Sequence, residues 1–409
     1  MSRFAAVVCL VLATNFAFAE DWPGWRGPRS DGTVSDTGYP TTWSATENVK
    51  WKTLVPGAGH SSPVVSKGKV FVTSCLKDEK NRVLYCIDRA SGKIVWEKVV
   101  LVSDLERKHG ENSYASSTPA CDGERVYVSF LDMPQMRVYC YDYEGNKLWE
   151  KNPGEFHSVH GFGVAPMLYK NLLILNGDQD ATAFIVALDK TTGEEKWRTD
   201  RPTKLRSYCP PVIVDAAGKK QLVLTGSKCV ASYDPDTGKQ LWIIEGPTEQ
   251  FVSSMVLHDG VLLMTAGFPV HWVMAIDPSG AGNVTKTHVL WSKKNEGGYV
   301  PSPVAHAGKL FVVDDKQGFA SCWDVKTGKE YWKEKLGGAT GYHASAVAAE
   351  GRVYFTNDDG VTFVVKAEGE LDVIAKNALG ERVYASPAFS NGDIFHRGEK
   401  HLWCIGKKP

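Results

Sequence analysis

The sequence predicts an all-β fold: an eight-bladed β-propeller of four-stranded antiparallel blades, closed by the N-terminal strand. Three observations predict it. A hairpin motif recurs along the chain, in which a tryptophan follows a turn glycine by four residues. Short apolar strands joined by tight turns occur between these motifs. The composition, with 39 glycines and 11% aromatic residues in a chain of 409, suits strands connected by many turns.

The hairpin motif is clearest in the segment VLYCIDRASGKIVWEK, residues 83–98. Its first half is β-branched and aromatic, Asp88 opens a turn, and Gly92 supplies the positive φ of a short loop. Trp96 lies on the return strand. The same offset occurs at Gly92–Trp96, Gly145–Trp149, Gly193–Trp197, Gly238–Trp242 and Gly328–Trp332. One offset repeated this often indicates a repeat protein.

Each repeat contains four predicted strands, called A to D. The A–B turns lie at Gly68, Gly123, Asn171, Gly218, Gly260, Gly308, Gly351 and Gly392. Asn171 replaces glycine because asparagine tolerates the left-handed region. Seven repeats have a D strand, with an insertion at 278–288 in the fifth, whereas the eighth ends without one. The segment Asn48–Val55, which carries Trp51, is therefore expected to complete blade eight and remove an open edge.

Three segments divide the chain. Residues 1–19 have the pattern of a secretory signal peptide, with an apolar run too short to span a bilayer and Ala17-Phe18-Ala19 before Glu20. Residues 20–45 contain three tryptophans and are expected to form a strap packed along the outside of the fold. Residues 46–409 form the propeller. We expect a periplasmic or secreted monomer with no transmembrane segment.

Charge and cysteine usage set further limits. The chain has 47 basic and 47 acidic residues, so no net field attracts nucleic acid. Cys86, Cys140, Cys322 and Cys404 occupy one small-residue position of the repeat, filled elsewhere by alanine or serine. Equivalent positions in separate blades are too far apart to bridge, so we expect most cysteines to be reduced. No Cys-x-x-Cys or Cys-Cys motif indicates zinc, haem or a vicinal disulfide.

The turn aspartate, the Thr-Gly-Lys turn and the tryptophan resemble the PQQ-like repeat of quinoprotein β-propellers. The best matches are TGKQLW at 237–242 and TGKEYW at 327–332. In size the chain is most similar to the BamB-like outer-membrane assembly propellers, and this resemblance implies a non-catalytic binding or scaffold protein. The alternative is a divergent PQQ-dependent alcohol or sugar dehydrogenase. That branch carries adjacent cysteines and a calcium set that the sequence does not match, so no cofactor is expected, and PQQ with calcium belongs to the alternative.

Pairs of acidic residues and one pair of histidines are the candidates for a metal or catalytic site. Asp314-Asp315 and Asp358-Asp359 fall near B–C turns, where acidic residues are usually solvated turn formers. His157 and His160 lack a third ligand. We therefore predict neither catalytic residues nor a metal site.

An aromatic residue or histidine precedes each A strand, where the loops entering the central channel form a funnel. The ring consists of His60, Tyr114, Phe162, Tyr208, Phe251, Tyr299, Tyr342, His343 and Tyr384. Two interpretations stay open: the side chains seal the channel by packing, or they form an aromatic pocket for a small ligand or a protein partner.

Overall fold

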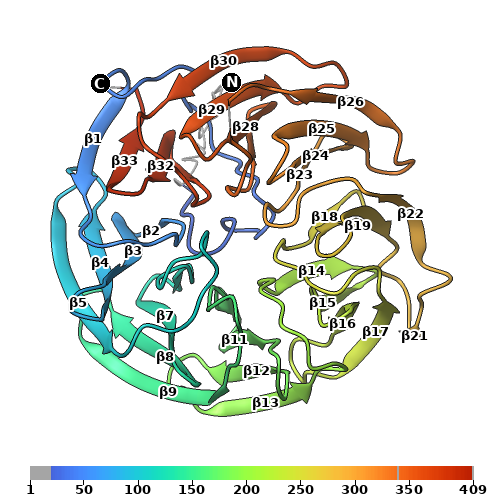
Figure 1. The fold of residues 1–409 in the computed structure, drawn as a ribbon, viewed down its shortest axis with the longest axis horizontal. Coiled ribbons are helices and arrows are strands. Elements are labelled where there is room, and N and C mark those ends of the chain that lie inside the picture. Colours follow the sequence, from blue (N-terminus) through green and yellow to red (C-terminus); the bar gives the residue numbers. More distant parts are fainter. Residues whose placement is uncertain (1–19, 339, 408–409) are drawn as a thin grey trace, which may run out of the picture.

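The computed structural model describes residues 20–338 and 340–407, so the predicted signal peptide lies outside the described residues. Eight antiparallel sheets are arranged in a ring, and the described residues form no helix (Figure 1). In each sheet, strand A lies innermost and strand D outermost. The predicted eight-bladed β-propeller is thus confirmed. No helix of residues 20–338 and 340–407 is long and apolar enough to cross a membrane.

The first four blades follow the chain in order. Blade 1 contains β2 (Val64–Ser66), β3 (Lys69–Leu76), β4 (Asn81–Asp88) and β5 (Ile94–Val102). Blade 2 contains β6 (Ala120–Cys121), β7 (Arg125–Asp132), β8 (Gln135–Asp142) and β9 (Lys147–Glu155). Blade 3 contains β10 (Met167–Tyr169), β11 (Leu172–Gly177), β12 (Phe184–Asp189) and β13 (Glu195–Asp200). Blade 4 contains β14 (Val212–Ala216), β15 (Lys219–Gly226), β16 (Cys229–Tyr233) and β17 (Gln240–Glu245).

The remaining blades complete the ring. Blade 5 contains β18 (Val256–His258), β19 (Val261–Ala266), β20 (Trp272–Ile276) and β22 (Val289–Lys294). Blade 6 contains β23 (Val304–His306), β24 (Lys309–Val313), β25 (Phe319–Asp324) and β26 (Glu330–Lys335). Blade 7 contains β27 (Val347–Ala349), β28 (Arg352–Thr356), β29 (Val361–Lys366) and β30 (Val373–Ala378). Blade 8 contains β31 (Ala388–Ser390), β32 (Asp393–Arg397), β33 (His401–Ile405) and β1 (Val49–Leu54).

Strand β1 is the outer strand of blade 8. It pairs antiparallel with β33, and Trp51 lies opposite Cys404. The eighth sheet therefore joins strands from the two ends of the propeller sequence. That this pairing is what holds the ring closed stays a prediction.

The glycine–tryptophan offset has a packing reason. The turn glycine of one blade lies on the tryptophan ring of the preceding blade: a Cβ added to Gly238 would lie 2.5 Å from Trp197. The indole of Trp197 also donates a hydrogen bond to the Pro235 carbonyl in the same turn, at 3.1 Å. The same ring contact recurs at Gly92 on Trp51, Gly145 on Trp96, Gly193 on Trp149 and Gly328 on Trp291. The repeat motif is thus the joint between neighbouring blades.

The small-residue position lies directly across from this tryptophan. Cys86 pairs with Trp96, and Cys140 pairs with Trp149 in the C–D ladders. A small side chain leaves room for the indole, which explains why cysteine, alanine and serine alternate there. The eight cysteines of the described chain are all buried free thiols.

Two local expectations are wrong. At the third A–B turn the left-handed residue is Lys170, with φ 52°, rather than Asn171. The strap does not lie along the outside. Trp22 pairs with Val65 of β2, and the guanidinium of Arg26 donates to the carbonyls of Pro303 and Ala346. The first part of the strap therefore passes across the inner strands of the blades, where Figure 1 shows the blue chain near the centre. Its end runs outward, and the Trp43 N–H donates to Asn377 of β30, the outer strand of blade 7.

The insertion in blade 5 reaches its neighbour. It contains β21 (Gly282–Asn283), which pairs parallel with β17 of blade 4. No turn glycine covers Trp242 at this joint; its indole instead donates to Gln221 at 2.8 Å, and the ring is 0% exposed. The insertion replaces the repeat's own joint between these two blades.

Candidate functional site

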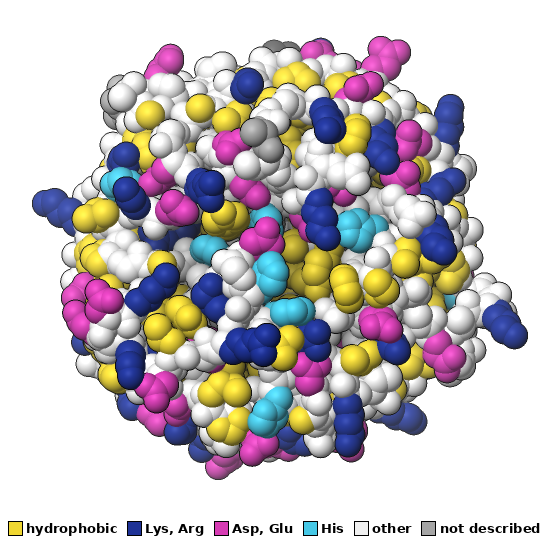
Figure 2. Space-filling model, viewed as in Figure 1, with side chains coloured by type: hydrophobic (Ala, Val, Ile, Leu, Met, Phe, Trp, Pro, Cys, Tyr) yellow, Lys and Arg dark blue, Asp and Glu magenta, His cyan; other side chains and the backbone are white. Residues whose placement is uncertain are grey.

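A pocket of about 580 Å³ lies at the centre of one face of the propeller. Its lining comes from the loops that enter the A strands and from the B–C turns, and Trp25 of the strap contributes as well. Figure 2 shows this face, with histidines and basic side chains gathered around the central hollow. The fold thus brings together side chains that are far apart in sequence.

The predicted ring divides into three groups. The residues that line the pocket are His60, Tyr208, Tyr299, His343 and Tyr384. Tyr114 lines a neighbouring cleft that also borders His60 and Tyr384. Phe162, Phe251 and Tyr342 are buried in the protein and line neither cavity. Packing and pocket formation are therefore both present in the ring, at different positions.

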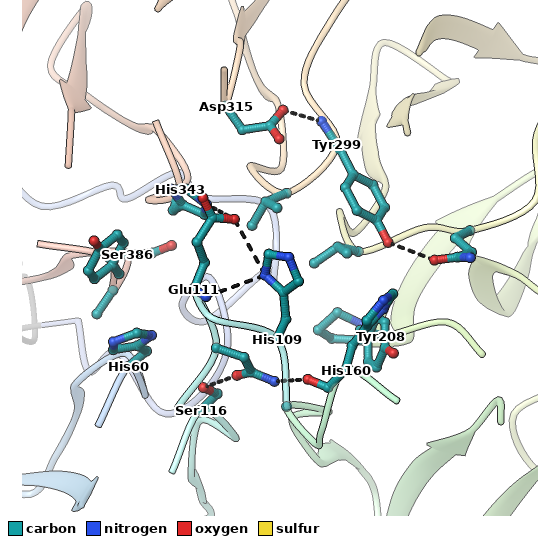
Figure 3. Close-up of a pocket in the computed structure, with 18 of the residues that line it drawn as sticks. His60, His109, Glu111, Ser116, His160, Tyr208, Tyr299, Asp315, His343 and Ser386 are labelled. Atoms are coloured by element: carbon teal, nitrogen blue, oxygen red, sulfur yellow. Dashed lines mark hydrogen bonds and ion pairs between the residues drawn. The ribbon is translucent and has the colours of Figure 1, made fainter. Parts of the chain in front are cut away.

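The aromatic side of the pocket is held by contacts between rings and by hydrogen bonds. Tyr384 lies between His60 and His343, with ring centroids 4.7 and 5.4 Å away. The hydroxyl groups of Tyr208 and Ser158 share a hydrogen bond of 2.5 Å. The Tyr299 hydroxyl donates to Gln250 at 3.3 Å. Figure 3 shows His60, His343, Tyr208 and Tyr299 around the same cavity.

His343 is fixed by a carboxylate. One oxygen of Asp358 accepts a hydrogen bond from the His343 backbone N–H at 3.0 Å, and the other lies 2.7 Å from its ring Nδ1. These two contacts leave Nε2 of His343 facing Glu111, whose carboxylate is 3.6 Å away. Burial opposes the charged ring, but the bond to Asp358 and the negative charges around it raise the pKa of His343.

His60, on the other side of Tyr384, has the opposite electrostatics. Burial, together with the positive charges of Lys108, His343 and Arg397, lowers the pKa of His60 to about 4. The pocket therefore contains two different imidazoles: that of His60, which is neutral at neutral pH, and that of His343, whose charged form is favoured by its acidic neighbours. A ligand meets a hydrogen-bonding group on one side and a group able to carry positive charge on the other.

A third polar group lies across the pocket. Nη1 of Arg206 donates to both carboxylate oxygens of Asp180, at 2.9 and 3.0 Å. Its Nε also donates to Nδ1 of His160 at 3.4 Å. Burial and the charge of Arg206 lower the pKa of His160. The pair fixes the guanidinium without enclosing it, since the Arg206 side chain is 21% exposed.

Several pocket residues carry no repeat signal. His109 and Glu111 lie in the long loop between β5 and β6, and Glu111 contacts both His109 and His343. Asp315 and Asp358 were expected to be solvated turn formers, but both are 8% exposed. Their signal was present in the sequence as paired acidic residues at equivalent B–C turns.

The comparisons with known proteins agree on one architecture. A family model described as outer membrane protein assembly factor BamB matches residues 32–100 and 79–334. The outer membrane protein assembly factor BamB of Yersinia pestis is 24% identical over 277 residues, which are 64% of this chain. That match spans 61% of the relative's own length, less than two thirds.

Two solved structures share the fold. BamB from Moraxella catarrhalis superposes with a TM-score of 0.62 at 11% identity, covering 88% of this chain and 97% of that one. Quinohemoprotein alcohol dehydrogenase from Comamonas testosteroni superposes with a TM-score of 0.68 at 14% identity, covering 95% and 81%. BamB and an alcohol dehydrogenase thus both have folds similar to this one, and at these identities the likeness shows the fold alone.

Proposed function

Since the chain belongs to the family described as outer membrane protein assembly factor BamB, we propose that it is an exported, non-catalytic binding or scaffold propeller. It takes a small ligand or a protein partner at the pocket on its funnel face, in the periplasm or outside the cell. The matched segments run from residue 32 to residue 334, so they include the second half of the strap and most of the predicted ring.

The observation that carries the proposal is the pocket itself. It has about 580 Å³ of space and is lined by aromatic rings together with charged and hydrogen-bonding groups. Ligand sites of proteins typically combine a concave aromatic surface with a few fixed polar groups. Asp358 and Asp180 fix His343 and Arg206 in this way.

The alternative function is that of a PQQ-dependent dehydrogenase, which the quinohemoprotein neighbour favours at the level of fold. The resemblance implies adjacent cysteines over the quinone. Among the described residues, the pocket lining contains no cysteine, and all eight thiols are buried. The residues present do not fit that feature of a quinone site. Absorbance with added PQQ and calcium, and dye-linked oxidation of alcohols and sugars, test this alternative directly.

The binding proposal is tested in two stages. A thermal-shift screen of glycans, quinones and peptides first identifies a compound that raises the melting temperature. The double variant Tyr299→Ala/Tyr384→Ala is then compared with the parent, because both rings line the pocket. We expect its affinity to fall by more than its melting temperature accounts for, since each aromatic contact contributes about 0.5–1.5 kcal/mol beyond area burial.

A matched control removes two tyrosines elsewhere. Tyr169→Ala/Tyr331→Ala changes the same residue type at sites that do not line the pocket, and its affinity should equal that of the parent. The proposal fails if no compound shifts the melting temperature, or if the pocket variant binds as well as the control variant.

A further inference from the structure

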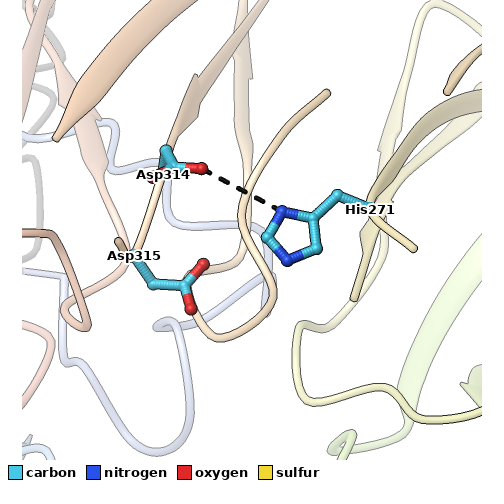
Figure 4. Close-up of side chains that lie close together, drawn as sticks. All are labelled: His271, Asp314 and Asp315. Atoms are coloured by element: carbon cyan, nitrogen blue, oxygen red, sulfur yellow. Dashed lines mark ion pairs between the residues drawn. The ribbon is translucent and has the colours of Figure 1, made fainter. Parts of the chain in front are cut away.

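Three potential metal ligands from adjacent blades meet at the edge of the pocket. His271 directly precedes β20 of blade 5, and Asp314 and Asp315 directly follow β24 of blade 6. One ligand atom from each side chain lies within 4.8 Å of the other two. Figure 4 shows both carboxylates facing the imidazole. His271 and Asp315 also line the pocket, so the cluster borders the cavity.

Each of the three side chains is fixed by the backbone on one side and free on the other. Asp314 Oδ1 accepts hydrogen bonds from the N–H groups of Lys316 and Gln317. Asp315 Oδ1 accepts from the Tyr299 N–H at 2.7 Å. The second oxygen of each carboxylate has no hydrogen-bond partner in residues 20–338 and 340–407. Both carboxylates are thus positioned, and each keeps one oxygen available for a ligand.

The imidazole is oriented in the same manner. Nδ1 of His271 lies 3.0 Å from the Gly297 carbonyl. A carbonyl oxygen can only accept, so Nδ1 carries a proton, and in the neutral imidazole Nε2 is then the nitrogen with the lone pair. A histidine that binds a metal usually donates its other ring N–H to a carbonyl or carboxylate in this way.

The charge of the cluster is not compensated. Asp314 Oδ2 lies 4.0 Å from Nδ1 of His271, and within the described chain neither carboxylate forms an ion pair with a lysine or an arginine. Asp315 is 8% exposed. Two neighbouring carboxylates, one of them buried, are unfavourable without a partner of opposite charge. A divalent cation would balance both negative charges.

The spacing also fits a coordination sphere. In an octahedral site with bonds of about 2.1–2.3 Å, neighbouring ligand atoms are about 3 Å apart and opposite ones about 4.4 Å. Ligand atoms that lie within 4.8 Å of one another reach this arrangement by small side-chain rotations. Among the described residues, no other group of three brings its ligand atoms this close.

We propose that His271, Asp314 and Asp315 bind one divalent transition-metal ion, with its open coordination positions facing the pocket. Imidazole favours transition metals over Ca²⁺ and Mg²⁺, whereas carboxylates suit Mn²⁺ and Zn²⁺ alike. The open positions would take water or an oxygen of a bound ligand, such as a carboxylate or a hydroxyl group. Cation binding does not depend on the proposed ligand, so this inference stands or falls independently of the proposed function.

The test uses the full mature chain, stripped with a chelator and titrated with Mn²⁺ by calorimetry and by electron paramagnetic resonance. We expect one tight Mn²⁺ site per chain, with Zn²⁺ competing and with Ca²⁺ binding more weakly. Asp315→Asn and His271→Gln should each weaken Mn²⁺ binding by at least about tenfold. Because asparagine keeps the oxygen that accepts from Tyr299, Asp315→Asn should retain a cooperative melting transition.

The control variant Glu155→Gln/His157→Gln removes a histidine and a carboxylate that lie 3.0 Å apart and exposed. It should bind Mn²⁺ as the parent does. The proposal is overturned if Asp315→Asn and His271→Gln bind Mn²⁺ like the control, if the parent shows no stoichiometric site, or if Ca²⁺ binds more tightly than Mn²⁺.

Discussion

The outer joints of the propeller and the pocket at its centre are built in different ways. Each joint repeats one contact, a turn glycine on the tryptophan of the preceding blade, with the same geometry around most of the ring. The contacts in the pocket do not repeat from blade to blade: Asp358 holds His343, Asp180 holds Arg206, and Ser158 shares a hydrogen bond with Tyr208. We therefore expect the joints to contribute more to the stability of the fold than the pocket does.

The largest expected effect concerns the one blade made by both ends of the propeller sequence. Deleting Asn48–Val55 removes β1, so β33 loses its outer partner and an open edge is exposed. We expect aggregation or a large loss of unfolding cooperativity in scanning calorimetry. Leu54→Thr, at a position of β1 that is 60% exposed, should melt like the parent. A deletion protein with the parent's transition would show that β1 does not close the ring.

A single joint tryptophan should cost less, but more than a pocket tyrosine. Trp197 is 9% exposed and lies under Gly238 of the next blade. Trp197→Ala should lower the free energy of unfolding by about 3–5 kcal/mol. Tyr384→Ala, in the pocket, should lower it by less, and chemical denaturation of both variants measures the difference. Equal losses would contradict the division between joints and pocket.

This difference also explains what the sequence could predict. The blade count, the four strands and the role of Trp51 follow from a repeated pattern, because identical joints need identical residues. The pocket does not repeat, so only its ring positions could be located. Tyr342 is buried whereas the adjacent His343 faces the cavity, and no pattern distinguishes these two neighbours. Likewise, the tryptophans of the strap indicate burial without indicating that Trp22 and Trp25 lie near the centre.

Contacts between polar residues outside the repeat pattern could not be predicted from the sequence. Glu111 contacts His343 only because the long loop between blades 1 and 2 reaches the loop that enters blade 7. His271 and Asp315 come together only when blades 5 and 6 are side by side. Such contacts depend on how the blades are arranged in space, which a linear spacing does not reveal.

The reactivity of the thiols opposite the joint tryptophans tests the same packing without removing any side chain. Burial raises the pKa of Cys140 to about 12, so the native protein should react slowly with thiol reagents. Under denaturing, non-reducing conditions most of the eight thiols of the described chain should titrate. Three or four disulfides would contradict the packing described above.

Substitutions at the small-residue position opposite the joint tryptophan measure how much this packing contributes to the free energy of unfolding. Ser232 occupies that position in blade 4, where its hydroxyl donates to Gln221 at 2.7 Å. Blade 1 offers no comparable partner at the position of Cys86, since burial and nearby charges alone shift the pKa of that thiol, without a hydrogen bond. Cys86→Ser should therefore cost about 1–3 kcal/mol, the penalty for an unsatisfied buried hydroxyl. Cys86→Ala, measured by the same denaturation, should cost less than the serine variant.

The smallest effects should come from the two pocket histidines, and they should differ in sign. The pKa of His343 is raised in the folded protein by Asp358, with Glu111 and Asp315 contributing. The stability that its charged form supplies is complete below the ordinary histidine pKa of about 6.5, and it is lost as the pH rises through the folded value. The advantage of the parent over His343→Gln should therefore shrink above about pH 6.5.

His60 should behave in the opposite way. Its folded pKa is about 4, because burial and the charges of Lys108, His343 and Arg397 disfavour protonation. Folding then keeps the ring neutral, and the parent loses stability as the pH falls from about 6.5 through about 4. The variant His60→Gln lacks this loss, so it should gain on the parent in acid but not in alkali. Melting temperatures of the parent and both variants across pH 4–9 measure the two trends. If the two differences varied with pH in the same window, Asp358 would not be what separates the two imidazoles, and the pocket would respond to pH as one uniform environment.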